Sequence, residues 1–279
     1  MAEQDTNGHS GAWQDSFDLV ACDGTPTPRL LYKYFSYHPP DENDRTETIF
    51  RNDKLYFAAP KDFNDPFDSV TRLTYPKSPT EREHLLTKFA YRGRLPISEH
   101  EIRRWVKTDA DIPYMDKVCE DLTYQMQREN AVFCMTEEKD SILMWAHYAG
   151  QHTGFCLEFR TDNPLFSRVR HVIYSRYHPK EDLVQLLTST VRPLPLYLVT
   201  KAEAWAYEKE WRLADPGPGP GQRDYPAESL TGVIFGCRMN AKDRAQTKEW
   251  CRDRMPRPAL YEAKEKRTEF SLDITPVSY

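Results

Sequence analysis

The sequence predicts an α+β fold, in which a mixed, mainly antiparallel sheet forms the core and a helical insertion occupies about residues 76–130. Two observations lead to this expectation. Short aromatic and apolar runs, such as LLYKYF at 30–35 and GVIFG at 232–236, have the composition of strands. Between them lies a stretch that is rich in helix start and stop signals.

The composition indicates a folded, globular chain. Apolar residues make up only 39% of it, but 16 Tyr, 13 Phe and 6 Trp bury large surfaces per residue. A chain of 279 residues can bury a sizeable core, so we expect a single domain at 29–279 behind a loosely ordered tail at 1–28. The net charge of −5 disfavours a non-specific nucleic-acid binder, which makes a small molecule the expected ligand.

The cysteines and the hydropathy pattern indicate a cytoplasmic protein. The 6 cysteines are scattered and form no CxxC pair, which suggests a reducing compartment. No stretch approaches the roughly 20 apolar residues that cross a bilayer, and the first residues lack a basic flank followed by an apolar run. We therefore expect no membrane partner.

The first elements along the chain are two strands. The run at 30–35 is the first, and 55–58 is the second, because it follows a turn-forming Asn-Asp pair and ends before Pro60. We expect these two strands to lie in one sheet.

The helical insertion contains three helical segments. The first starts at Pro79 and ends on Gly93, the second opens with a capping-box pattern of Ser98 and Glu101, and the third covers 115–127. Arginines and lysines are interleaved with aromatic residues there. They form either the solvated face of amphipathic helices or a surface for a nucleic acid or an acidic partner.

A compact unit follows the insertion. It consists of a strand at 131–135, a helix that starts at Asp140 or Ser141 and ends at Gly150, and a strand at 155–159. The helix sequence ILMWAHYA is apolar nearly all round, so we expect the helix to be buried.

The last part of the chain returns to the sheet. A strand at 171–174 precedes a helical run at 180–188, and the segment 215–226, DPGPGPGQRDYP, is expected to be a mobile loop. The final elements that we expect are a strand at 232–236, a helix at 241–253 and a strand at 268–274.

The stretch at 201–212, KAEAWAYEKEWR, carries the strongest chemical signal. If its backbone is extended, Glu208, Glu210 and Arg212 lie on one face of a strand. Carboxylates beside aromatic walls and a fixed cation are suited to stabilising a developing positive charge or to accepting a proton. The alternative is a surface strand with one solvated face.

Two other places hold candidate binding residues. In FNDPFD at 63–68, Asn64 and Asp65 either close the turn by bonding to the backbone or point into a pocket and fix a ribose or a metal. His147 lies beside Trp145 and Tyr148 in the apolar helix and is expected to be buried. It is either a satisfied core histidine or a group that grips a planar ring such as nicotinamide or adenine.

Several common signatures are absent from the sequence. No HExxH or other close His pair supports a metal centre, and the glycine-rich nucleotide loops and the GxSxG motif are missing. Cys134 and Cys156 lie in apolar strands, where inert packing is the favoured use. His152, in the loop before Gly154, is the histidine that we expect to face solvent.

Four motifs can be read together: LYKYFS at 31–36, NDKLYFAAPKDFNDPFD at 52–68, FCMTEEKDSILMWAHYAGQHTGFCLEF at 133–159 and KAEAWAYEKEWRL at 201–213. In this order and spacing they resemble the bacterial domain-of-unknown-function family 2971. The resemblance covers about residues 30–240, and NDPFD, MWAHYA and YEKEWR are its most specific pieces. The family implies no activity.

The chain is also similar to ADP-ribosyltransferases, which use a basic residue on an early strand, aromatic residues near nicotinamide and a late ExE at a strand entrance. This resemblance implies NAD as the cofactor and transfer or hydrolysis of ADP-ribose. Glu210 would stabilise the oxocarbenium character of the breaking nicotinamide–ribose bond, and Glu208 would orient or activate the acceptor. Lys33 stands where an Arg or His is usual, and a Ser-Thr-Ser signature is absent.

Lys33 would meet the pyrophosphate, and Trp145 and Tyr148 would shape the nicotinamide pocket. The full set of cofactor-binding residues that we expect is Lys33, Tyr34, Asn64, Asp65, Trp145, His147, Tyr148, Phe155 and Arg212.

Three functions are compatible with the sequence. The first is an ADP-ribosyltransferase or NAD glycohydrolase, a toxin or defence effector with a protein or nucleic-acid acceptor that the loop at 215–226 recognises. The second is a metal-dependent nuclease or phosphoesterase built on Asp65, Asp68, Glu208 and Glu210. The third is a non-catalytic module that docks a partner through the insertion, with Arg103 and Arg104 in the contact.

Overall fold

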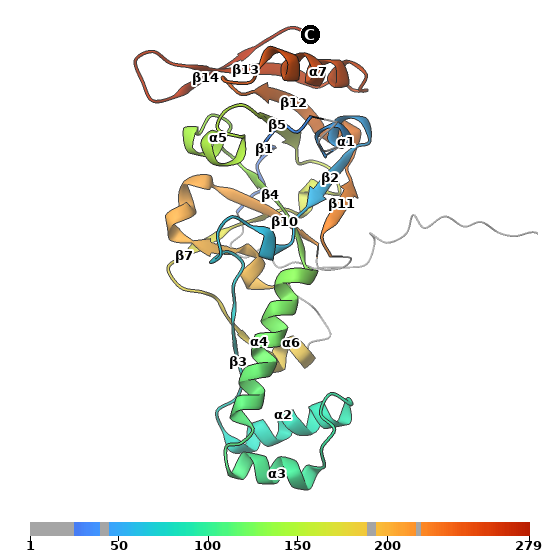
Figure 1. Cartoon of the computed structure of the whole chain (residues 1–279), viewed down its shortest axis with the longest axis vertical. Coiled ribbons are helices and arrows are strands. Elements are labelled where there is room, and N and C mark those ends of the chain that lie inside the picture. The colour runs from blue at the N-terminus through green and yellow to red at the C-terminus, as the bar shows by residue number, and fades with distance from the viewer. Residues whose placement is uncertain (1–24, 40–44, 189–193, 216–218) are drawn as a thin grey trace, which may run out of the picture.

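The computed structural model describes residues 25–39, 45–188, 194–215 and 219–279, and Figure 1 shows its elongated shape. The tail expected at 1–28 lies outside the described residues up to residue 24. Most of the strands lie in the upper part of Figure 1, and a group of helices projects from the lower end.

The described residues form an eight-stranded sheet that confirms the α+β prediction. In their order across the sheet, its strands are β14 (Leu272–Pro276), β13 (Ala259–Glu265), β12 (Leu230–Phe235), β5 (Phe155–Arg160), β1 (Leu30–Phe35), β4 (Ala131–Thr136), β10 (Glu210–Asp215) and β6 (Arg170–His171). β12 and β13 run parallel, and the other neighbours are antiparallel. The sheet is therefore mixed and mainly antiparallel, as the sequence predicts.

Within the described residues, three short strand pairs lie outside this sheet. They are β2 (Lys54–Phe57) with β11 (Gly221–Asp224), β3 (Arg72–Thr74) with β8 (Lys180–Asp182), and β7 (Ile173–Ser175) with β9 (Thr200–Ala202). The first pair is antiparallel and the other two are parallel. The short 3-10 helices of the described chain are η1 (Pro60–Asp62), η2 (Phe166–Arg168), η3 (Leu196–Val199), η4 (Glu203–Glu208) and η5 (Ala227–Ser229).

The two faces of the large sheet have separate cores, because successive side chains of a strand point to opposite faces. On one face, Phe133 and Trp211 pack with residues of α1 (Arg45–Arg51) and α7 (Ala241–Arg252). On the other face, Tyr34 and Cys156 pack with α5 (Ile142–Tyr148). The sheet is thus covered by helices on both faces over its upper part (Figure 1).

The helical arm consists of α2 (Pro79–Tyr91), α3 (Glu99–Lys107), α4 (Ile112–Glu129) and α6 (Leu183–Thr188), which share a core of their own. It is the predicted insertion with α6 added, and α4 connects its far end to the sheet (Figure 1). The capping box of α3 is present: the Glu101 backbone N–H donates to Ser98 Oγ over 3.3 Å, and the Ser98 N–H donates to Glu101 Oε2 over 2.9 Å.

Three predictions about elements are wrong in part, and one strand was not predicted. β1 and β2 do not share a sheet, since β2 pairs with β11. β11 itself lies in the segment that the sequence predicts to be an irregular loop, of which residues 216–218 lie outside the described residues. The predicted helical run at 180–188 begins with three residues of strand, and the sequence pattern does not predict β13. In each case a non-local strand partner decides the local structure.

The prediction that the helix α5 is buried all round is also wrong. Met144 and Trp145 are buried against the sheet, but Ile142 is 38% and Leu143 is 45% exposed. His147 is exposed as well, since it lies on the same outer side of the short helix. Among the described residues, none of the helices combines the length and the apolar character that a membrane crossing requires.

Gly154 joins α5 to β5 at a point where two backbones touch. A Cβ atom at this position would lie 2.0 Å from the Phe35 carbonyl oxygen and 3.0 Å from that of Ala149. Because both obstacles are backbone atoms, they cannot move aside as a side chain does.

We predict that Gly154→Ala lowers the free energy of unfolding by about 3 kcal/mol or more, since the added methyl group forces β1 and β5 apart. Gly93→Ala is the matched control: nothing lies within 4 Å of the place that its methyl group would take, and only its φ of +67° is unfavourable. That variant should lose about 1 kcal/mol. Urea denaturation measures both, and equal losses would contradict the prediction.

Candidate functional site

The stretch at 201–212 is not the single extended strand considered from the sequence. Lys201 lies in β9, residues 203–208 form η4, and Lys209 adopts a left-handed conformation with φ 43° before β10 begins at Glu210. Glu208 and Glu210 therefore do not alternate along one strand. The turn at Lys209 nevertheless brings both carboxylates to the ammonium group of Lys201.

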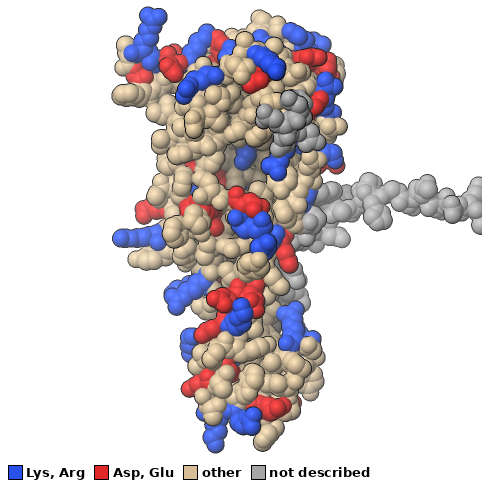
Figure 2. Space-filling view, viewed as in Figure 1, with Lys and Arg blue, Asp and Glu red and all other residues tan. Residues whose placement is uncertain are grey.

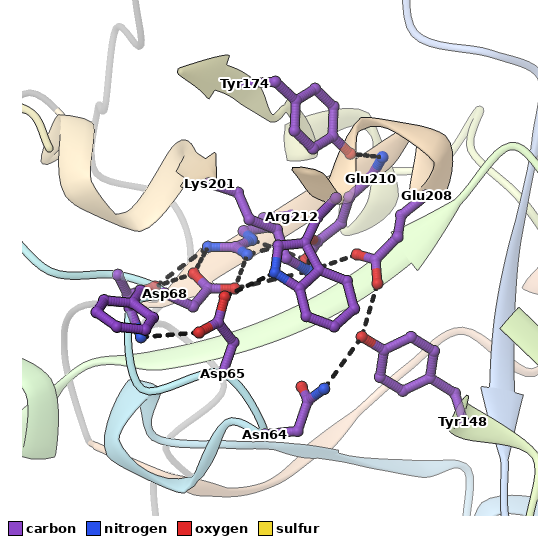
Figure 3. A network of polar contacts seen from close by, with 12 residues as sticks. Asn64, Asp65, Asp68, Tyr148, Tyr174, Lys201, Glu208, Glu210 and Arg212 are labelled. Atoms are coloured by element: carbon purple, nitrogen blue, oxygen red, sulfur yellow. Dashed lines mark hydrogen bonds and ion pairs between the residues drawn. The ribbon is translucent and has the colours of Figure 1, made fainter. Parts of the chain in front are cut away.

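Five charged side chains form what we call the buried charge cluster: Asp68, Lys201, Glu208, Glu210 and Arg212 (Figure 3). The exposed fraction of each residue is at most 6%. Lys201 Nζ contacts the Glu208 carboxylate, lies 2.9 Å from Glu210 Oε2 and 3.6 Å from Asp68 Oδ2. A single ammonium group thus holds three carboxylates together.

Arg212 is the second cation of the cluster. Its Nε donates to Glu210 Oε1 over 2.7 Å, and its two terminal nitrogens donate to the two oxygens of Asp68 over 2.8 and 2.7 Å. The Leu198 carbonyl accepts a further bond over 3.0 Å. Such bidentate, charge-assisted pairing offsets the large desolvation penalty of a fully buried guanidinium.

The two glutamates differ in their pKa values. Burial acts to raise the pKa of Glu210, but Arg212 and then Lys201 outweigh it, so the pKa lies well below the ordinary value of 4.5. For Glu208, burial outweighs the attraction of Lys201, and the nearby Glu210 charge adds to it, so the pKa is raised. Glu210 is therefore held as a carboxylate, whereas Glu208 takes up a proton more readily than Glu210 does.

Charge balance explains this difference. Three carboxylates face two cations, so the fully ionised cluster carries an excess negative charge in a place that excludes water. Burial lowers the pKa of Lys201, but Glu210 and Glu208 outweigh it and keep the ammonium protonated. The excess charge falls on Glu208, because the guanidinium of Arg212 is directed at Glu210 and Asp68 instead.

A row of hydrogen bonds connects Glu208 with the surface (Figure 3). The Tyr148 hydroxyl donates to Glu208 Oε1 over 2.6 Å, and Asn64 Nδ2 donates to the Tyr148 hydroxyl over 3.5 Å. Tyr148 is half-buried and Asn64 is exposed. Burial raises the pKa of Tyr148, so its hydroxyl stays protonated and remains a donor.

Asp65 and Trp205 form the wall next to this row. Trp205 Nε1 donates to Asp65 Oδ2 over 2.7 Å, and Asp65 Oδ1 accepts the Phe67 backbone N–H over 2.9 Å. The Trp205 ring also lies 5.1 Å from Lys201 Nζ and 6.1 Å from the ring of His147. Asp65 thus closes its own turn and also holds an aromatic ring against the buried charge cluster.

Four of the predicted cofactor-binding residues lie apart from this site. Lys33 and Phe155 belong to the opposite face of the sheet, where Lys33 Nζ lies 5.3 Å from the ring centroid of Phe133. The register of the strands explains the position of Lys33. Glu210 pairs with Thr136 and Thr136 with Tyr32, so these three side chains lie on one face of the sheet. Lys33 follows Tyr32 in β1, so its side chain lies on the other face.

Tyr34 and Trp145 lie on the same face as Glu210, but in the core beneath α5. Their rings meet at 5.1 Å, the Tyr34 hydroxyl donates to the Glu138 carbonyl, and Trp145 Nε1 donates to the Lys139 carbonyl. His152, expected to face solvent, is half-buried and stacks on Trp145 at 6.3 Å. These side chains hold the scaffold of α5 in place.

The structure therefore brings together Asn64, Asp65, Tyr148, Glu208, Glu210 and Arg212 of the predicted site and adds four residues that were not among the expected cofactor-binding set. These are Asp68, Tyr174, Lys201 and Trp205. The Glu210 backbone N–H donates to the Tyr174 hydroxyl over 2.8 Å. Lys201 and Trp205 lie in the stretch that carries the strongest signal in the sequence, whereas nothing local to Tyr174 marks it.

In the metal hypothesis a divalent cation binds four carboxylates, but in the structure three of these carboxylates contact a lysine side chain. The point where Asp68, Glu208 and Glu210 meet holds the Lys201 ammonium group. Within the described ranges, no group of three or more His, Cys, Asp and Glu side chains is arranged to bind a metal ion. Burial raises the pKa of the thiols of Cys134 and Cys156, which fits the inert packing expected for them.

Residues 144–213 match the family described as Protein of unknown function (DUF2971). This match confirms the predicted resemblance to the family over these residues. The DUF2971 segment runs from α5 into β10 and contributes Tyr148, Lys201, Glu208, Glu210 and Arg212 to the site. Asn64, Asp65 and Asp68 come from outside it. No curated protein and no solved structure matches the chain.

We predict that Glu210→Gln and Glu208→Gln differ in stability at neutral pH. The first leaves Arg212 with one of its two buried carboxylate partners and should lower the free energy of unfolding by about 3–5 kcal/mol. The second removes the excess charge and keeps an oxygen for the Tyr148 hydroxyl, so its loss should stay below about 1 kcal/mol. Equal losses in urea denaturation would show that the two carboxylates are equivalent.

The pH dependence gives a second prediction. As the pH falls towards the ordinary Glu pKa of 4.5, native Glu208 takes up a proton that the unfolded chain does not, so wild type gains stability relative to Glu208→Gln. Glu210 acts in the opposite direction. Its contribution is complete above pH 4.5 and is lost as the pH falls towards its depressed pKa.

The measurement is urea denaturation of wild type and both variants at several pH values between about 3 and 7. A difference between wild type and Glu208→Gln that does not change with pH would contradict the raised pKa of Glu208.

Proposed function

We propose that this protein is an enzyme that cleaves the bond between nicotinamide and ribose in NAD and transfers ADP-ribose to an acceptor or to water. The observation that carries the proposal is the position of Glu208. Its carboxylate lies at the entrance of β10, within an ExE, between the Lys201 ammonium group and the Tyr148 hydroxyl. The resemblance to ADP-ribosyltransferases implies a carboxylate at such a strand entrance.

The chemistry requires a group that stabilises positive charge on the ribose. When the C1′–N bond breaks, its electron pair leaves with nicotinamide, and the ribose acquires oxocarbenium character. A carboxylate that binds a ribose hydroxyl stabilises this state more than the ground state. A water molecule or an acceptor hydroxyl, thiol or amine then attacks C1′ and gives up its proton.

Glu208 is better suited to these steps than Glu210. The contacts of the Glu210 carboxylate go to Arg212 and Lys201, and its residue is 3% exposed. Glu208 meets Tyr148, whose neighbour Asn64 is exposed, so a ribose hydroxyl reaches Glu208 by taking the place of the Tyr148 hydroxyl. The raised pKa of Glu208 also makes it the stronger base for the acceptor proton.

Glu210 then acts as a positioning residue. It fixes Lys201 and Arg212, and through Lys201 it sets the place and the pKa of Glu208. The side chains of Tyr148 and Trp205 supply aromatic surface beside the reacting bond, where a nicotinamide ring stacks.

The two other hypotheses have weaker support. Of the four carboxylates that a metal-dependent nuclease would use, Asp68, Glu208 and Glu210 already share the Lys201 ammonium group. On the helical arm, Arg103 pairs with Glu83 and Glu99, and Figure 2 shows charges of both signs interspersed over this face. A surface of that kind gives a partner no single-signed patch to bind.

The test is release of nicotinamide from NAD by the purified protein, with and without cell lysate. Glu208→Gln should lower the rate at least about 100-fold while the protein stays folded. Glu203→Gln, an exposed glutamate in the same η4, is the matched control and should keep wild-type activity. Glu210→Gln should lose activity together with stability.

No release by wild type in either condition would overturn the proposal. Release that survives Glu208→Gln and is lost in a folded Glu210→Gln protein would return the catalytic role to Glu210.

A further inference from the structure

A cavity of about 170 Å³ lies next to the buried charge cluster. The turn at 175–179 forms one side of it, and Phe67, Val70 and residues 200–202 form the other. Its volume is below the roughly 300 Å³ of a pocket that encloses a whole small-molecule ligand. The cavity therefore suits one part of a larger ligand.

Basic side chains line the cavity. Arg176, His178 and Lys201 are among the lining residues and no Asp or Glu is, although the whole chain has a net charge of −5. Lys201 is neutralised by the buried charge cluster, but Arg176 has no carboxylate partner within the described parts of the chain. A free guanidinium at the mouth of a cavity is suited to a phosphate group.

Two exposed aromatic side chains flank the cavity. Tyr177 is 76% and Phe67 is 67% exposed, so neither ring is used by the core. Planar rings of this kind stack on nucleobases, whose flat faces they match.

The walls are held rigid by the backbone. Ser175 Oγ donates to the Tyr177 carbonyl over 2.8 Å and accepts the Tyr177 N–H over 3.0 Å, which closes a tight turn. At the other end of the turn, the Pro179 carbonyl accepts the Arg72 N–H over 3.0 Å. The turn thus presents Arg176 and Tyr177 from a fixed backbone, which lowers the cost of ordering them on binding.

We propose that this cavity is a nucleotide subsite that holds a purine base and its 5′-phosphate, with Tyr177 and Phe67 against the base and Arg176 and His178 at the phosphate. Two elements tie the subsite to the candidate active site. The loop at 63–69 supplies Phe67 to the cavity and Asp65 and Asp68 to the other site, and Lys201 belongs to both.

The identity of the full ligand rests on the proposed function: the adenylate half of NAD occupies the subsite while the nicotinamide riboside half lies at Glu208. The recognition of a purine nucleotide by the cavity stands on its own observations, and AMP is its probe.

The test is isothermal titration with AMP, adenosine and ribose 5-phosphate. AMP should bind more tightly than either fragment. Tyr177→Ala should weaken AMP and adenosine about tenfold or more, because a base loses its stacking partner, and Arg176→Ala should weaken AMP and ribose 5-phosphate to a similar degree. Both side chains are exposed, so the variants should fold as wild type does.

The matched controls are Tyr91→Ala and Arg104→Ala on the helical arm, which should bind AMP as wild type does; Tyr91 is 82% exposed. The proposal of a subsite is wrong if AMP does not bind, or if AMP binds the cavity variants and the control variants equally well.

The two proposals fail separately. If Tyr177→Ala and Arg176→Ala cleave NAD with an unchanged KM, the proposed function is supported and the proposed subsite is wrong. If AMP binding depends on both residues but the protein releases no nicotinamide, the proposed subsite is supported and the proposed reaction is wrong.

Discussion

The burial of the two cations Lys201 and Arg212 is the constraint on which the arrangement around β9 and β10 depends. Two cations without water require anionic partners at hydrogen-bond distance, since the desolvation of each one alone costs several kcal/mol. Asp68 comes from a loop far away in the sequence, and Glu208 and Glu210 come from either side of a left-handed residue. The charges therefore hold the 63–69 loop, β9 and β10 in one arrangement.

The same constraint separates the roles of two glutamates that look equivalent in sequence. Arg212 reaches Glu210 and Asp68, which keeps Glu210 ionised. Glu208 carries the excess negative charge of the cluster. It also accepts a hydrogen bond from the hydroxyl of Tyr148, which in turn contacts the exposed Asn64. Two cations and the carboxylates that they bind thus surround one glutamate whose pKa is raised, and perturbed pKa values of this kind are common at catalytic sites.

Much of the fold was predictable because its signals are local. The capping box at Ser98 and the aromatic runs of β1 and β5 need only a few neighbouring residues to express their preference. β11 and β13 were not predicted, since a Pro-Gly-rich stretch becomes a strand only when β2 offers a partner, and β13 depends on β12 and β14. Pairing between distant segments is invisible to local composition.

The sequence by itself determined which residues have the chemical means: the ExE at 208–210, Arg212, and the Asn64–Asp65 turn. It also determined the DUF2971 resemblance, which the match at 144–213 confirms. Only the tertiary structure decided that Lys33 points to the opposite face and that Lys201 joins three carboxylates. Sheet register and burial set these outcomes, because strand pairing chooses the face of each side chain and desolvation then forces every buried charge to find its partner.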